Sequence, residues 1–270
     1  MVICGIRKAA FHLERLFIRD RESRPVKAID QVNIGVCGLG KNVGTTFIAS
    51  LLAFYFEIKG KRISFTQVGS PAMCSSLLYE AVAMEQRFYG RDFYDIYREI
   101  SEGNPVRNLQ NHELGVNWTL ITPFDVADGI ELAKDEVARL VGNSKGDICI
   151  FDIDVGNDGE TALDDMDHII AVCDPLPSKM SCNLNNFKRL KQRELSGRAG
   201  FAWIVNGVNK GVSRRQVKGF LKSDSIVWIE SFPVEEIYSD EYHCRFHWGN
   251  KTIKTAVTPE FDKLSGILNV

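Results

Sequence analysis

Short apolar runs that alternate with helix-like segments are the feature that most constrains the fold of this chain. The runs are apolar at successive positions, so both faces of each strand must be buried. They are predicted as strands at residues 32–37, 62–68, 118–122, 148–153, 168–173, 201–206 and 225–229. Such strands require a sheet covered by helices on both sides, and right-handed crossovers connect them. The sequence therefore predicts an α/β fold: a doubly wound, mostly parallel sheet in a three-layer sandwich.

The segments between these runs are predicted as helices, and one more helix precedes them. The predicted helices cover residues 45–58, 75–101, 125–140, 179–193 and 213–221, the second of them rich in aromatic residues. Residues 3–21 form a basic stretch with apolar residues at helical spacing. We expect a helical extension over residues 1–30 and a single domain over residues 31–270. The extension either packs on the domain or a dimer partner, or lies at a membrane surface.

Composition excludes several classes of protein. Hydrophobic residues make up 44% and charged residues 25%, which is typical of a globular chain and not of a disordered one. The net charge of −2 argues against a surface built for nucleic acid. The seven cysteines show no C-x-x-C spacing, so no zinc or redox site is indicated. We expect a cytoplasmic protein, with peripheral membrane contact through residues 1–30 or the tail 259–270 as a weaker alternative.

The loop after the first strand carries the pattern of a phosphate site. It lies between a strand and a helix start, where backbone N–H groups and the helix dipole favour anions. Its candidate residues are Gly38, Gly40, Lys41, Asn42, Val43, Gly44, Thr45 and Thr46. A full phosphate loop would read G-x-x-x-x-G-K-[ST], and Thr45 stands at the lysine position. The loop is thus either a working phosphate site or a retained turn that binds no nucleotide.

Later strand ends add a family resemblance. Residues 147–156 (DICIFDIDVG) resemble the D-x-h-h-h-D-x-x-x-G signature of MinD/ParA-type P-loop ATPases of the SIMIBI class. Residues 167–175 look like the next strand and its proline turn, 201–206 like the strand ending in a base-recognising asparagine, and 229–234 like the loop along the adenine. The resemblance covers roughly residues 31–268 and identifies a member with a degenerate Walker A motif.

The resemblance implies a role for individual residues. Thr46 would coordinate Mg²⁺, and Asp152 would hold the metal through water. Gly156 would begin a segment that senses the γ-phosphate, Asn206 would contact adenine, and the backbone at Pro233 would line it. The implied cofactor is ATP with Mg²⁺.

Departures from the family pattern bear on mechanism. Members have lysines where this chain has Thr45 and Gly40, and their second strand ends in an acidic residue that is missing after Gln67. Lys41 lies one position from the second missing lysine and would substitute for it in a shifted loop. Because phosphoryl transfer depends on placed positive charge, we expect ATP to bind weakly or not at all. Hydrolysis is the less expected activity, and whether the chain is an enzyme stays open.

Two functions follow from these expectations. The first is a MinD/ParA-like regulatory or positioning protein that forms a homodimer and recruits a protein partner. The second is a pseudo-ATPase scaffold or adaptor that binds no nucleotide and acts through residues 1–30 and the aromatic segment 88–97. A metal-insertion or iron–sulfur relative would need a cysteine pair that the spacing does not provide. Residues 188–193 are basic and are interpreted as a solvated helix face, with nucleic acid as the weaker alternative.

Overall fold

The computed structural model describes residues 30–69, 76–86, 89–90, 92–107, 110–155 and 157–270. In these residues the main sheet has eight strands in the order β10-β9-β8-β1-β7-β2-β6-β5. The strands are β1 (Val32–Gly38), β2 (Ile63–Val68), β5 (Asn111–Glu113), β6 (Val116–Thr119), β7 (Ile148–Ile153), β8 (His168–Cys173), β9 (Gly200–Val208) and β10 (Ile226–Glu230). Neighbours are parallel except β5 and β6. The predicted doubly wound, mostly parallel sheet is confirmed.

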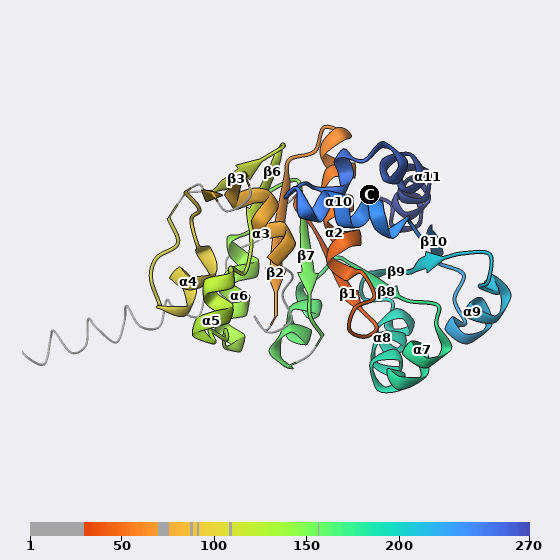
Figure 1. The fold of residues 1–270 in the computed structure, drawn as a ribbon. Coiled ribbons are helices and arrows are strands. Elements are labelled where there is room, and N and C mark those ends of the chain that lie inside the picture. Colours follow the sequence, from red (N-terminus) through yellow and green to blue (C-terminus); the bar gives the residue numbers. More distant parts are fainter. Residues whose placement is uncertain (1–29, 70–75, 87–88, 91, 108–109, 156) are drawn as a thin grey trace, which may run out of the picture.

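Helices cover both faces of this sheet (Figure 1). One face packs against α2 (Thr45–Ile58), α3 (Ser76–Ala83), η4 (His247–Gly249) and α11 (Lys251–Leu268). The other packs against α4 (Ile96–Ser101), α6 (Lys134–Asn143), η3 (Asn157–Asp165), α7 (Pro177–Cys182), α8 (Leu184–Ser196) and α9 (Arg214–Leu221). The remaining two α-helices are α5 (Pro123–Asp128) and α10 (Val234–Tyr242).

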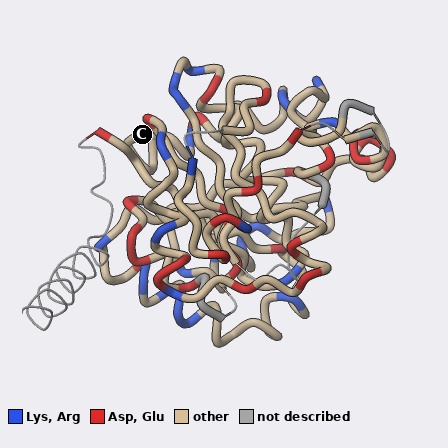
Figure 2. Tube along the Cα trace, turned by 90° about the vertical axis from the view of Figure 1, so that its left-hand side faces the viewer, with Lys and Arg blue, Asp and Glu red and all other residues tan. Residues whose placement is uncertain are grey.

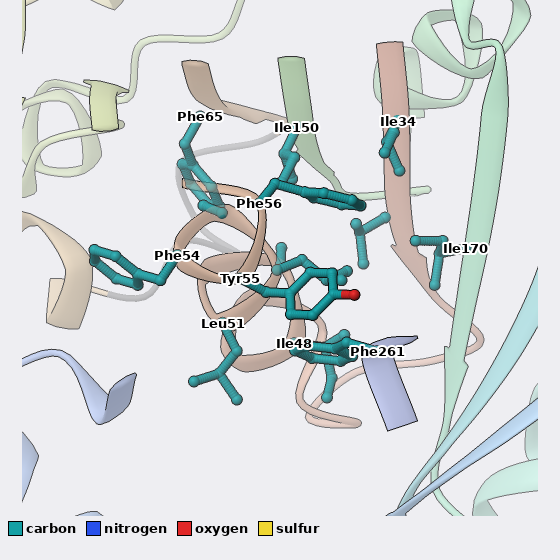
Figure 3. Close-up of a cluster of buried hydrophobic side chains, with 14 of the residues drawn as sticks. Ile34, Ile48, Leu51, Phe54, Tyr55, Phe56, Phe65, Ile150, Ile170 and Phe261 are labelled. Carbon is teal, nitrogen blue, oxygen red and sulfur yellow. The ribbon is translucent and has the colours of Figure 1, made fainter. Parts of the chain in front are cut away.

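Helix α2 is nearly surrounded by apolar side chains. Its residues 48–56 are all buried, because the helix lies between the sheet and α11. Figure 3 shows Phe56 among Ile34, Phe65 and Ile150 of the strands, and Tyr55 beside Phe261 of α11. Burying apolar surface contributes about 25 cal/mol per Å². Apolar packing on several sides thus fixes the position of α2, the helix that follows the loop of residues 38–44.

Three predicted helices differ from the structure. Residues 75–101 are not one helix, because β3 (Met84–Gln86) and β4 (Tyr89–Gly90) pair between α3 and α4. The predicted helix 125–140 is interrupted at Gly129, whose φ of +63° ends α5 before α6 begins at Lys134. The predicted helix 179–193 is divided at Asn183 into α7 and α8. The proposed extension of residues 1–30 lies outside the described residues, apart from Asp30.

The C-terminal tail is part of the core. Residues 259–270, considered above for membrane contact, belong mostly to α11, whose apolar residues Ile253, Val257, Phe261, Leu264 and Leu268 are buried. The apolar face of this helix is therefore occupied by the sheet and α2. No helix in the described part of the chain is long and apolar enough to cross a bilayer.

Charge is mixed over the molecule. In Figure 2, Lys and Arg are interspersed with Asp and Glu along the chain. This mixture in the described residues is in keeping with the small net charge of −2 of the whole sequence.

Candidate functional site

A cavity of about 1000 Å³ opens at the carboxyl ends of the central strands. From β1 the chain continues to β2 on one side and later to β8 on the other, so the strand order reverses there. Ligands of doubly wound sheets bind at such a switch point. The predicted residues that line the cavity are Gly38, Gly40, Lys41, Asn42, Val43, Gly44, Thr45, Thr46, Asp152 and Asn206. Pro233 precedes α10 beside the lining residue Phe232, and Gly156 lies outside the described residues.

The loop of residues 38–46 turns sharply into α2. Gly44 has a φ of +86° and sits at the N-cap of this 14-residue helix, whose first turn has no acidic residue. The amide of Asn206, at the end of β9, donates a hydrogen bond of 3.0 Å to the carbonyl of Val43. A side chain at Gly44 would collide with Asn206. The loop is thereby held so that the positive end of the helix dipole faces the cavity.

Thr46 and Asp152 form a polar pair beneath the loop. The Thr46 hydroxyl donates a hydrogen bond of 2.7 Å to Oδ2 of Asp152. Burial raises the pKa of the Asp152 carboxyl to about 6, although hydrogen bonds from Thr46 and Gln67 favour the carboxylate, and the charge of Asp154 adds to the rise. Gln67 lies beside Asp152 in the sheet, and its Oε1 accepts the backbone N–H of Ile121 at 3.1 Å. Gln67, near the end of the strand that has no carboxylate, therefore helps to fix Asp152.

A hydroxyl and a carboxylate are the ligand types that Mg²⁺ takes from proteins. This ion usually keeps several waters and binds one or two protein groups plus the substrate phosphates. Across the described residues no group of three or more His, Cys, Asp or Glu side chains could hold a metal. Thr46 and Asp152 thus fit Mg²⁺ that arrives with a phosphate ligand.

Thr45 and Gly40, the two positions at which the family resemblance implies lysines, are filled in different ways. At the first, Thr45 places its hydroxyl against Gly38, where a Cβ would lie 2.6 Å from it. At the second, a side chain on Gly40 would meet the amide of Asn183. Lys41, next to Gly40, is exposed at the cavity rim.

Helices α7 and α8 contribute contacts that the sequence analysis missed. Lys179 donates to Oδ2 of Asp174 at 2.7 Å and to the carbonyl of Asn42 at 3.1 Å. Asn186 donates to the carbonyl of Leu39 at 3.2 Å. The available signal was the three-residue spacing of Asn183, Asn186 and Arg189, which places all three on one helix face after β8.

The opposite wall of the cavity is aromatic. The ring centroid of Phe47 lies 6.0 Å from that of Phe232 and 5.1 Å from that of His247, and all three residues line the cavity. Ile237 and Leu78 extend this apolar wall. Flat aromatic surfaces of this kind stack well on planar rings such as nucleobases. The cavity thus combines the N-terminus of α2 with an apolar wall.

Comparisons with known proteins place the fold. No protein-family model and no curated protein matches the sequence. Among solved structures, the septum site-determining protein MinD from Pyrococcus horikoshii OT3, complexed with Mg-ADP, matches with a TM-score of 0.66 and 14% identity, covering 87% of this chain and 94% of that chain. A ParA family ATPase from Chlorobium tepidum TLS matches with a TM-score of 0.64 and 11% identity over 85% and 96%.

A third solved structure carries a nucleotide analogue. The putative plasmid partition protein from Borrelia burgdorferi B31, bound to AMPPNP, matches with a TM-score of 0.62 and 17% identity over 88% of this chain and 98% of that chain. Together these matches show that this chain has the MinD/ParA-type P-loop fold.

Proposed function

We propose that this chain is a nucleotide-binding regulatory or positioning protein that takes Mg²⁺-ATP in the cavity at the head of α2. The observation that carries the proposal is the hydrogen bond between Thr46 and the buried Asp152, directly beneath the loop 38–46. Phosphates would lie on the loop, Mg²⁺ between them and this pair, and the base toward Phe47 and Phe232. Two solved structures with the same fold are bound to AMPPNP and to Mg-ADP, which supports this assignment.

Hydrolysis is expected to be slow or absent. Phosphoryl transfer needs cations on the transferring group and a positioned water. Thr45 cannot supply a charge, and Gln67 is engaged by Asp152 and the backbone of Ile121. Each missing charge-assisted contact costs about 1.5–3 kcal/mol, or roughly a factor of 10 to 100. Nucleotide binding would therefore act as a conformational signal, read by a second copy of the chain and by a protein partner.

The alternative is a scaffold that binds no nucleotide. It is favoured by the hydrogen bonds from Asn206 to Val43 and from Asn186 to Leu39, which hold the loop with the chain's own side chains. Asn183, moreover, occupies the space beside Gly40. In this case the fold would serve only to present surfaces to other proteins.

Calorimetric titration with Mg²⁺-ATP and Mg²⁺-ADP separates the two functions. Micromolar binding is expected in the wild type, with a loss of at least about tenfold in Thr46→Ala and Asp152→Asn. Thr258→Ala is the matched control, since that hydroxyl bonds only the helix backbone of α11 at Lys254. No heat at millimolar nucleotide would reject the proposal in favour of the scaffold.

A further inference from the structure

Polar side chains on one face of α8 lie against the loop of residues 38–46. Asn183 lies against Gly40, and Asn186 donates to the carbonyl of Leu39. Arg189 is next along this face, lines the same cavity, and is 45% exposed. The face therefore brings a cation to a loop that has lost both of its family lysines.

Arg189 is held at the cavity by two partners. Its Nη1 forms an ion pair with the Glu160 carboxylate of η3, and its Nη2 donates to Oδ1 of Asn186 at 2.5 Å. Asn186 in turn donates to Leu39 of the loop. These contacts make a continuous connection from the loop, through α8, to η3, which follows the strand bearing Asp152.

We propose that Arg189 binds the nucleotide phosphates in place of the missing loop lysines, exchanging Glu160 for a phosphate oxygen. The proposal rests on the proposed function and adds a phosphate-binding residue to it. An ion pair as exposed as Arg189–Glu160 contributes little, so exchanging its partner costs little. A guanidinium fork also matches phosphate geometry with two parallel hydrogen bonds. Lys179 lies close to the loop too, but it is turned to Asp174 and the carbonyl of Asn42 and does not line the cavity.

A neighbouring arginine provides the control. Arg193, one turn further along α8, pairs with Asp164 of η3 at 2.8 Å and contacts the carbonyl of Glu160 at 3.4 Å. It joins the same two elements as Arg189 but does not line the cavity. A purely structural role of the α8–η3 ion pairs would make the two arginines equivalent.

The test compares binding of two probes, Mg²⁺-ATP and inorganic tripolyphosphate, by calorimetry. Arg189→Ala is expected to weaken both by about 10- to 100-fold, the worth of one charge-assisted contact. Arg189→Lys should recover part of the loss, and Arg193→Ala should bind both within about twofold of the wild type. Thermal unfolding of each variant verifies that the fold is intact.

The outcomes distinguish this proposal from the proposed function. If Arg189→Ala binds both probes as the wild type does, or if Arg193→Ala loses as much affinity, the role of Arg189 is wrong while ATP binding stands. If the wild type binds tripolyphosphate through Arg189 but not ATP, the proposed function fails and the phosphate site stands. If the wild type binds neither probe, both are wrong.

Discussion

The buried carboxyl group of Asp152 and the partly buried one of Asp95 invite comparison. Burial raises the pKa of Asp152 to about 6, and burial together with the neighbouring Asp125 raises the pKa of Asp95 to about 6, against the N–H and charge of Arg98. Asp152 lines the cavity at the start of α2, whereas neither Asp95 nor Asp125 lines it.

The two regions, Asp95 with its neighbour Asp125 and Asp152 with its cavity, differ in what surrounds the carboxyl groups. Asp125 accepts hydrogen bonds from the backbone and hydroxyl of Thr122, forming the capping box that begins α5, and lies 3.5 Å from Arg98. Asp152 instead shares its surroundings with a helix N-terminus and an open cavity. In both regions a raised carboxyl pKa therefore reports burial. Only at Asp152 do a cavity and the N-terminus of a helix lie beside the carboxyl, and these features point to a ligand.

The largest expected effect is on stability, in the Asp125 region. Asp125→Ala should lower the free energy of unfolding by about 3 kcal/mol, because it removes the N3 half of the capping box of α5 and the fully buried ion-pair partner of Arg98. Urea unfolding measures this. Asp128→Ala is the control: Asp128 is 56% exposed and also pairs with Arg98, so its loss should cost at most about 1 kcal/mol. Equal effects of the two variants would contradict a structural role for the Asp125 cluster.

The second effect is on the pH dependence of stability. The folded-state pKa of Asp152 is about 6 against an ordinary 3.8, so its ionisation opposes folding. Its stabilising contribution is complete below pH 4 and is lost as pH rises through 6, a difference of about 3 kcal/mol. Unfolding titrations from pH 4 to 7 should show that Asp152→Asn lacks this loss.

Repeating the unfolding titrations with a bound ligand tests the difference between Asp152 and Asp95 further. Mg²⁺-ATP should flatten the Asp152 part of the pH profile, because a divalent cation favours the carboxylate, and should leave the part that Asp95→Asn removes unchanged. A ligand that altered both parts, or neither, would break the distinction between a ligand site and a structural cluster.

The smallest expected change in stability comes from substituting two glycines with positive φ. Gly129 ends α5 with a φ of +63° and open space around it, so Gly129→Ala should cost about 1 kcal/mol of stability and leave ATP binding unchanged. Gly44→Ala should cost about 1–2 kcal/mol and also abolish ATP binding, since the added Cβ displaces Asn206 from the loop. Unfolding and calorimetry on both variants decide this, and ATP binding by Gly44→Ala would show that the loop tolerates a different shape.

Local patterns predicted the central strands and the loop well. Buried parallel strands must be apolar at successive positions, and β1, the loop and α2 are contiguous in sequence. The strand β5 was not predicted, because it has three residues and pairs at the sheet edge, where one antiparallel neighbour sets its conformation. The break between α5 and α6 was readable, since Thr122 and Asp125 form a capping signature and Gly129 ends the helix three residues after Val126.

The sequence by itself determined the doubly wound sheet and the place of the loop between β1 and α2. That Thr46 and Asp152 are joined by a hydrogen bond is a finding of the structure. Only the tertiary structure decided which side chains lie against the loop at Gly38 and Gly40. Asn186 and Leu39 are 147 positions apart along the chain, yet a hydrogen bond joins them. The aromatic wall likewise unites Phe47 with His247. Periodicity reports which face of an element is buried, but which element lies opposite follows from the order of the strands and the packing of helices across them.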